Sequence, residues 1–246
     1  MSSEVVFVGT SDAFGAGGRR QSAIVVRTAS GTTLLDCGAT TGTGLHALGI
    51  SRDEIDTILV SHFHADHFGG IPLHLLGALY EDERRAPLCI AGPPGIEARV
   101  RALAAAMGHA IEGREWTFEI RFEELPAGRE VEVGPSRVHS FETNHSPDSV
   151  PHGIVIESGS ERIAYSGDTG WFDALPDRVA GANLFISECT YHQRGFEYHL
   201  NHELLVENRH RFDCGRILLT HLGAQMSDRR GRCDFETADD GLKIRV

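Results

Sequence analysis

The chain is poor in the residues that a nucleic-acid-binding protein needs. Lysine is almost absent, no run of five or more basic residues occurs, and the formal net charge is −12. Proteins that follow a phosphate backbone present a positive surface to it. The composition therefore disfavours structured RNA as a partner and favours a small-molecule substrate.

Cysteine is also scarce, with five residues, an odd number, and no pair has the spacing of a zinc ribbon or a redox motif. The first residues lack the basic segment of a signal peptide, and no apolar run approaches the length of a membrane span. We therefore expect a cytoplasmic protein with reduced thiols and no membrane association.

What is present is a globular composition, with 246 residues of which 41% are hydrophobic and no linker of low complexity. We expect a single domain over residues 1–246. The two halves are each rich in strand patterns and each contains helices, which predicts an α+β fold of four layers (αββα) with two mixed sheets and outer helices. Strands are expected over 5–8, 23–27, 32–36, 56–60, 88–91, 116–123, 130–133, 137–143, 153–157, 162–166, 184–187, 217–219 and 242–246, and helices over 40–48, 69–85, 94–107 and 201–210.

The densest chemical signal lies directly after the apolar run 58–60. His62, His64, Asp66 and His67 fall within six residues. A strand that ends in such a cluster presents it on a loop at one sheet edge, which is where catalytic metal sites occur. Neither His62 with His64 nor Asp66 with His67 completes a four-ligand set, so further ligands must come from later in the chain.

Later candidates stand at the ends of predicted strands, at His145, Asp168, Glu188 and His221. If these strands run in one direction at that edge, their loops meet on one rim. The first ion would take His62, His64, His145 and one oxygen of Asp168. The second would take Asp66, His67, His221 and the other oxygen of Asp168, since only a carboxylate has two oxygens to share.

Imidazole and carboxylate ligands without thiolate suit two Zn²⁺ ions, with Mn²⁺ or Fe²⁺ as alternatives. Two ions about 3.5–4 Å apart would hold a bridging hydroxide ready to attack a substrate. Two dications, two aspartates and one hydroxide sum to a charge of about plus one. Such a site favours an anionic reacting group such as a phosphodiester.

The Gly-rich segment 9–20 lacks the Gly-Lys-Ser/Thr of a nucleotide-binding P-loop. It follows the first strand, and Arg19 or Arg20 at its end is our candidate for a substrate contact, with a merely mobile loop as the alternative. The segment 42–47 fits G-x-G-x-x-A, but the acidic residue expected after the next strand is missing. We interpret it as a turn and a helix start.

With its metal-ligand positions filled in order, the chain resembles the metallo-β-lactamase-fold hydrolases. Within them it is most similar to the ribonuclease Z-like phosphodiesterases, through segments 8–10 and 20–22, Glu188 in Ser-Glu-Cys-Thr and His199 in Tyr-His-Leu-Asn. The resemblance implies that His199 donates a proton to the leaving oxygen, that Glu188 holds His199 cationic, and that Asp66 orients the hydroxide. It also allows a homodimer.

One departure bears on the substrate. Transfer-RNA-processing enzymes of this branch carry a long arm between the positions of His145 and Asp168, whereas here only residues 146–167 intervene. We therefore expect a smaller phosphodiester, cyclic or nucleotide-like. The alternatives are another hydrolase (of a lactone, thioester, β-lactam or sulfate ester), an iron oxygenase, or a metal-binding protein without activity.

Overall fold

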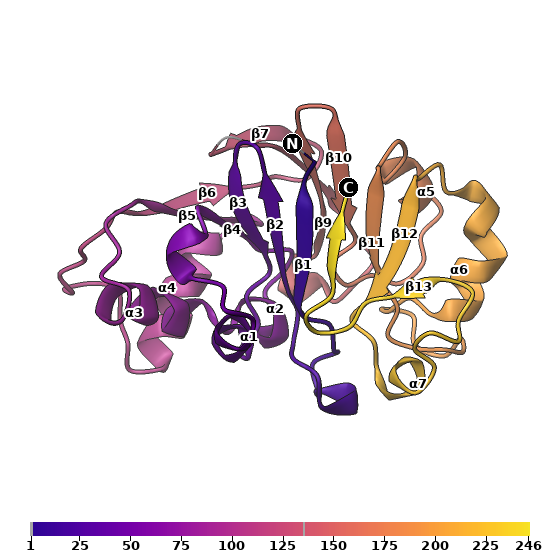
Figure 1. Ribbon diagram of the computed structural model, residues 1–246, viewed down its shortest axis with the longest axis horizontal. Coiled ribbons are helices and arrows are strands. Elements are labelled where there is room, and N and C mark those ends of the chain that lie inside the picture. The colour runs from indigo at the N-terminus through magenta and orange to yellow at the C-terminus, as the bar shows by residue number, and fades with distance from the viewer. Residues whose placement is uncertain (1, 135) are drawn as a thin grey trace.

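The computed structural model describes residues 2–134 and 136–246, which form two seven-stranded sheets (Figure 1). The first sheet has the order β14 (Lys243–Arg245), β1 (Glu4–Gly9), β2 (Ala23–Thr28), β3 (Gly31–Leu35), β4 (Thr57–Leu59), β5 (Leu88–Gly92), β6 (Ile120–Glu124). The second has the order β13 (Glu236–Thr237), β12 (Arg216–Thr220), β11 (Leu184–Glu188), β10 (Glu161–Tyr165), β9 (His152–Ser158), β8 (Ser136–Glu142), β7 (Glu130–Val133).

The sheets face each other across a shared apolar layer, and helices cover their outer faces. Phe7 and Ile24 of the first sheet pack with Ile163 and Leu184 of the second. The first sheet is covered on its outer side by α1 (Thr41–Leu48), α3 (Ile71–Tyr80) and α4 (Ile96–Ala106), and the second by α5 (Leu175–Arg178), α6 (His202–Asn208) and α7 (Ala224–Ser227). The predicted four-layer αββα fold is confirmed.

Strand directions decide where the loops meet. β4 is parallel to β3 and β5, and β11 is parallel to β10 and β12. β9 is antiparallel to both β8 and β10, so β8 runs in the same direction as β10. The carboxyl ends of β8, β10, β11 and β12 therefore lie at one edge of the second sheet. The predicted ligand set depends on this arrangement, because it brings the loops after these strands to one rim.

Two expected elements differ most in extent. The helix expected over 69–85 begins at Ile71 and ends at Tyr80. The left-handed φ of 50° at Glu83 excludes a helix that continues to 85. Before it, α2 (Ala65–Phe68) is a separate turn of helix. The strand expected from 116 begins at Ile120, because the backbone bends at residues 117–118 before the chain pairs with β5.

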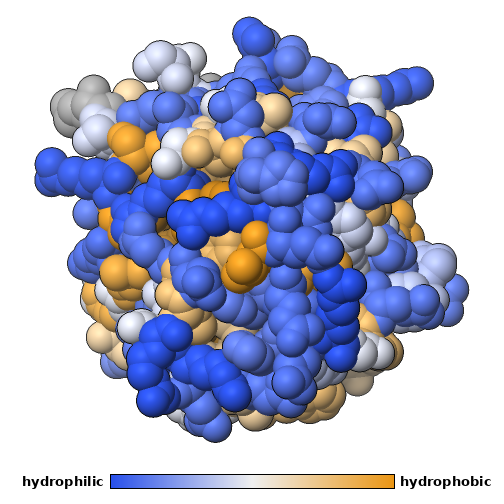
Figure 2. All heavy atoms as spheres, turned by 90° about the vertical axis from the view of Figure 1, so that its right-hand side faces the viewer, coloured by the Kyte–Doolittle hydropathy of each residue, from blue (hydrophilic) through white to orange (hydrophobic). Residues whose placement is uncertain are grey.

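The face of the molecule that carries α5, α6 and α7 is mainly polar (Figure 2). Figure 2 shows the side of the molecule that carries α5, α6 and α7, where hydrophilic side chains dominate and apolar ones form small separate patches. Within the described residues, none of the helices combines the length and the apolar character needed to cross a bilayer.

Candidate metal centre and catalytic site

The segment after β4 delivers four of the predicted ligands. His62 is fully buried behind the strand end, and His64 is the residue that precedes α2. Asp66 and His67 lie inside α2, and both are buried. The turn of α2 directs Asp66 and His67 toward one ligand group, whereas His62 and His64, which precede it, face the other.

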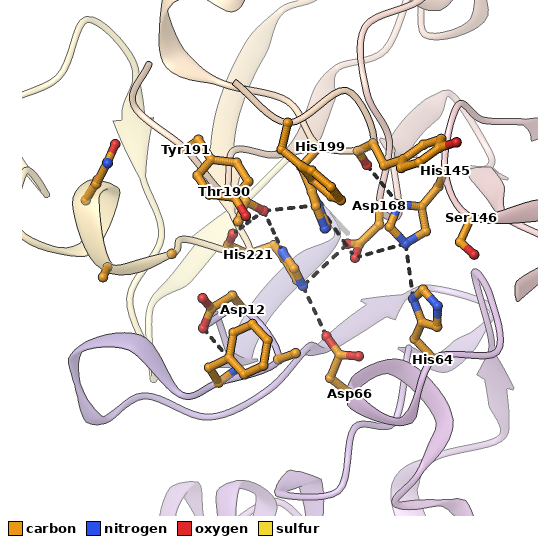
Figure 3. A pocket seen from close by; sticks show the side chains of 17 residues that line it. Asp12, His64, Asp66, His145, Ser146, Asp168, Thr190, Tyr191, His199 and His221 are labelled. Atoms are coloured by element: carbon orange, nitrogen blue, oxygen red, sulfur yellow. Dashed lines mark hydrogen bonds and ion pairs between the residues drawn. The ribbon is translucent and has the colours of Figure 1, made fainter. Parts of the chain in front are cut away.

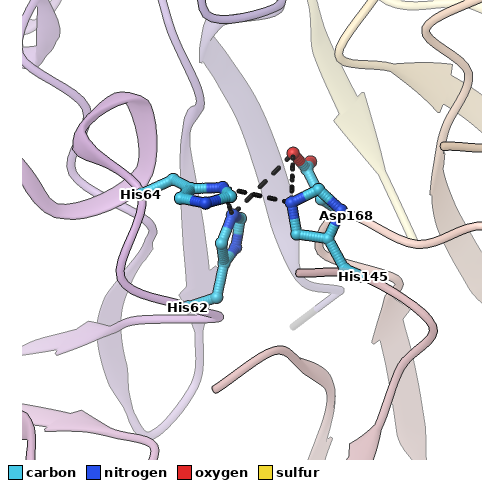
Figure 4. Close-up of side chains that lie close together, drawn as sticks. All are labelled: His62, His64, His145 and Asp168. Carbon is cyan, nitrogen blue, oxygen red and sulfur yellow. Dashed lines mark hydrogen bonds and ion pairs between the residues drawn. The ribbon is translucent and has the colours of Figure 1, made fainter. Parts of the chain in front are cut away.

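The first predicted ligand group comes together (Figure 4). His62, His64, His145 and Asp168 each offer an atom within 4.8 Å of the other three. His64 Nδ1 lies 3.1 Å from His62 Nε2 and 3.1 Å from His145 Nε2. Nitrogens bound tetrahedrally to zinc at 2.0–2.1 Å would lie about 3.3 Å apart, so these spacings fit a shared ion.

The second predicted group also comes together, from Asp66, His67, Asp168 and His221. His67 Nε2 is 3.3 Å from Asp66 Oδ2, and His221 Nε2 is 3.2 Å from the same oxygen. His221 reaches this place from the end of β12, across the cavity from the α2 turn (Figure 3).

Asp168 lies between the groups and turns one oxygen to each. Its Oδ2 is 3.8 Å from His62 Nε2 and 3.9 Å from His145 Nε2. Its Oδ1 is 3.3 Å from His67 Nε2 and 3.5 Å from His221 Nε2. Asp168 Oδ1 and His67 Nε2 are buried without a hydrogen-bond partner, a costly state unless a cation binds them. The donor set therefore fits a pair of metal ions.

Hydrogen bonds fix the orientation of His62 and His67. The Nδ1–H of His67 donates to Asp36 Oδ2 at 2.7 Å, which leaves Nε2 as the metal-binding atom. Ser61 Oγ donates to Asp36 Oδ2 at 2.9 Å and so accepts from His62 Nδ1–H at 3.0 Å. Both rings thus keep the tautomer that a metal ligand requires.

His145 and His221 are oriented by the second half of the chain. His145 Nδ1–H donates to the Tyr198 carbonyl at 2.8 Å. Thr190 Oγ1 donates to Glu188 Oε2 at 2.8 Å and accepts from His221 Nδ1–H at 2.9 Å. In each histidine the Nε2 atom is left to face the ligand group.

Asp36 is the functional residue that sequence reasoning missed, because we took it only as the end of a strand. It is fully buried, and besides His67 and the Ser61 hydroxyl it accepts from Tyr165 Oη at 2.8 Å and from the Ser61 backbone N–H at 2.7 Å. The available signal was an ionisable side chain directly after an apolar strand. The same signal had selected Asp168 and Glu188.

The two ligand carboxylates are held in their anionic form. Burial would raise the pKa of Asp66, but His67 and His221 hold that pKa below its usual range. Burial would likewise raise the pKa of Asp168, and His221 with His67 holds it well below. Both side chains therefore carry the charge that a dication needs.

Glu188 and His199 form a pair beside this centre. His199 Nδ1–H donates to Glu188 Oε1 at 2.9 Å, and Glu188 itself is fully buried. Burial would lower the pKa of His199, but the Glu188 carboxylate raises it to about 9. His199 is therefore a cation at neutral pH, with its ring 15% exposed at the cavity wall.

The predicted substrate contacts at Arg19 and Arg20 do not lie in the cavity wall. Arg19 is buried and donates to the carbonyls of Ala16, Thr10 and Leu222. Arg20 donates to the Val8 carbonyl at 2.7 Å and pairs with Asp240 at 3.5 Å. Their guanidinium groups are occupied by the fold, so we assign them a structural role in place of the expected one.

The metal-ligand groups open into a cavity of about 630 Å³, a volume typical of small-molecule sites. Its wall combines ligands from both halves with residues of the Gly-rich loop and of segment 190–198. The lining residues are Asp12, Ala13, Phe14, His64, Asp66, His145, Ser146, Asp168, Thr190, Tyr191, Phe196, Tyr198, His199, His221, Gly223, Ala224 and Gln225.

Comparison with known proteins assigns the chain to a family. The family described as "Anti-Pycsar protein Apyc1" matches residues 3–237. The Anti-Pycsar protein Apyc1 of Bacillus phage 010DV004 is 27% identical over 241 residues, which cover 92% of this chain and 91% of that protein. Ribonuclease Z of Halorubrum lacusprofundi is 36% identical over 158 residues, 64% of this chain and 48% of that protein. The match thus spans about half the length of that relative.

Among solved structures, the metallo-β-lactamase fold protein YhfI from Bacillus subtilis superposes with a TM-score of 0.78 at 20% identity, covering 99% of this chain and 100% of that one. The fold and the resemblance to ribonuclease Z inferred from the sequence are therefore confirmed. Since the family match extends over nearly the whole chain, this protein belongs to the family of the anti-Pycsar protein Apyc1, on a metallo-β-lactamase fold.

Proposed function

We propose that this protein is a two-metal phosphodiesterase that hydrolyses a small, nucleotide-like phosphodiester. The observation that carries the proposal is the division of Asp168 between two ligand groups, with a cationic histidine at the same cavity. Relatives named ribonuclease Z support hydrolysis of a phosphodiester on this fold.

One ion would be held by His62, His64, His145 and Asp168, and the other by Asp66, His67, His221 and Asp168. When bound, zinc ions supply Lewis acidity toward phosphoryl oxygens and make water acidic enough to attack at neutral pH. Asp66 lines the cavity and orients the attacking water.

His199 is our general acid. Its Nδ1 is committed to Glu188, so Nε2–H is the donor that remains for the substrate. Water adds to phosphorus, the P–O bond to the leaving alcohol breaks, and His199 gives its proton to that oxygen. Glu188 acts through His199 by keeping the ring charged and fixed in orientation, and it is therefore a positioning residue.

The cavity wall favours a substrate with one phosphate. Among residues 2–134 and 136–246, the lining contains no lysine or arginine. Charge on the substrate must then be balanced by the metal ions and by His199 alone, which is enough for a phosphodiester but poor for a polyanion. The short segment between His145 and Asp168 provides no arm for structured RNA. A cyclic nucleotide is the substrate that we favour.

The test is a substrate panel on protein whose metal content has been measured. It compares 3′,5′-cyclic nucleotides and aryl phosphodiesters with lactones and thioesters. We expect hydrolysis of the phosphodiesters only. Turnover of a lactone or thioester with no phosphodiester cleaved would refute the proposal.

The role of His199 is tested with His199→Ala, and His46→Ala, an exposed histidine on α1, serves as the control. His199→Ala should keep its metal ions and lose about 10²- to 10⁴-fold in kcat on substrates with alkoxide leaving groups. The loss of kcat on aryl phosphodiesters should be smaller, because their leaving groups need no proton. Equal losses of kcat on both substrate types would show that His199 is not the general acid.

A further inference from the structure

Phe14 is the most exposed large apolar side chain of the described residues, at 93%. It lies on the Gly-rich loop between β1 and β2, which protrudes between the two halves at the lower end of the view in Figure 1. Phe14 lines the same cavity as the metal ligands. An apolar ring left in water at the mouth of a binding site points to a ligand that covers it.

The loop holds Phe14 in a defined place. Asp12 Oδ1 accepts from the backbone N–H groups of Phe14 at 3.2 Å and Ala16 at 3.1 Å. Gly17, with a left-handed φ of 67°, packs against Ser227 of α7, where a side chain would collide with the Ser227 hydroxyl. Arg19 Nη2 donates to the Leu222 carbonyl at 2.9 Å and ties the loop to the segment of His221.

A second aromatic residue lies at the His199 side of the cavity. Phe196 is 48% exposed, and its ring lies 5.7 Å from that of His199 at an angle of 30°. Tyr191 and Tyr198 adjoin it, with ring centroids at 6.2 and 5.7 Å. All four side chains line the cavity. Figure 3 shows that Tyr191 and Asp12, which fixes the Phe14 loop, stand on opposite sides of His221.

We propose that Phe14 and Phe196 form an aromatic rim that binds the nucleobase of the substrate while its phosphate reaches the metal ligands. The inference rests on the proposed function, because it names the group that accompanies the phosphodiester. Stacking on an aromatic ring tolerates any base, since every base has a π-face. The cavity of about 630 Å³ exceeds the needs of a phosphate alone and suits a nucleotide.

The test measures binding rather than turnover, on the zinc-loaded full chain. AMP and ribose 5-phosphate share the ribose and the phosphate, and ribose 5-phosphate has a hydroxyl group at C1 where AMP has its base. Isothermal titration of both therefore isolates the base contact. Phe14→Ala should weaken AMP binding by about 5- to 150-fold and leave ribose 5-phosphate unchanged. Phe196→Ala should act in the same direction.

Tyr80→Ala is the matched control, since Tyr80 is 65% exposed and lies on α3, outside the cavity wall. It should change neither ligand. Phe14→Trp should restore AMP binding, whereas Phe14→Leu, which is apolar but not flat, should not. Equal weakening of AMP and ribose 5-phosphate, no effect on either, or no measurable AMP binding to the wild-type protein would overturn the inference.

The outcome is separable from that of the substrate panel. Base discrimination lost in Phe14→Ala, in a protein that cleaves no phosphodiester, would sustain the aromatic rim and refute the phosphodiesterase. If the protein cleaves cyclic nucleotides and Phe14→Ala binds AMP as tightly as the wild type, the phosphodiesterase is supported and the aromatic rim is refuted.

Discussion

The two halves of the molecule supply the proposed metal ligands in opposite ways. The first sheet contributes its ligands from a single segment, 62–67, in which the end of β4 and the turn of α2 set their relative positions. The second sheet contributes His145, Asp168 and His221 from the ends of three different strands. One half is organised by local backbone geometry, and the other is organised only once its strands are in register.

Each half also stores backbone strain at the site. Asp36 follows β3 with a φ of 58°, and His221 follows β12 with a φ of 52°. Non-glycine residues rarely adopt this left-handed conformation, and those that do concentrate at functional sites. In both halves a strand therefore ends in a turn that aims a polar side chain at the centre.

The largest effect is expected from Asp168→Ala, which removes the ligand that both halves share. Both ions should be lost together, and activity should fall to background. At a metal concentration of 100 times Kd each ion stabilises by about 2.7 kcal/mol, so the loss of both should lower Tm by about 10–20 °C. Elemental analysis and calorimetry check this, with Asp177→Ala as an exposed aspartate control. Retention of one tightly bound ion would show that the halves bind independently.

Asp36→Asn tests the support given by the first half. The amide cannot accept all the hydrogen bonds that the carboxylate takes from Ser61, His67 and Tyr165. We expect metal affinity or activity to fall about 10- to 100-fold, with the ion of His67 lost first in a chelator titration. Asp56→Asn, at a carboxylate outside the site, should leave the titration unchanged.

Arg19→Met tests the tie between the halves. It leaves the Leu222 carbonyl without its Arg19 donor, while the Thr10 carbonyl keeps only the Leu222 backbone N–H at 2.9 Å. This loss should cost about 1–3 kcal/mol and lower Tm by about 2–12 °C. Hydrogen exchange should quicken at 221–224 and stay unchanged at 62–67. A raised KM for phosphodiesters with unchanged Tm would instead restore Arg19 as a substrate contact.

An effect on stability alone, without a change in metal binding, is expected away from the site, at His74 of α3. It is buried with both ring nitrogens unpartnered, and burial lowers its pKa to about 3. Between pH 6.5 and about pH 3, His74 is protonated in the unfolded chain but neutral in the folded chain. The free energy of unfolding therefore decreases as the pH is lowered through this range. His74→Leu should stabilise by about 1–3 kcal/mol at pH 7.5 and by about 2 kcal/mol more at pH 5. Denaturant melts at both values check this, and equal gains would refute the titration.

How far the sequence led can be judged from particular residues. The ligand set was found because ionisable side chains followed apolar strands, and the structure brings all of its members together. Phe14 escaped this reasoning, because an isolated aromatic residue in a Gly-rich loop carries no pattern. Arg19 and Arg20 were predicted as substrate contacts because of their charge, but their guanidinium groups donate to backbone carbonyls of the protein.

Residue types and strand endings alone determined the class of fold, the chemistry of the candidate ligands and the prediction of a second ligand group, because these follow from residue types and short-range periodicity. Only the tertiary structure decided which oxygen of Asp168 faces which histidine, that Asp36 anchors the His67 ring, and that the Gly-rich loop places Phe14 at the cavity. Those facts depend on how two sheets pack and on the parallel course of β10, β11 and β12, and such contacts join residues too far apart in the chain for any local pattern to encode.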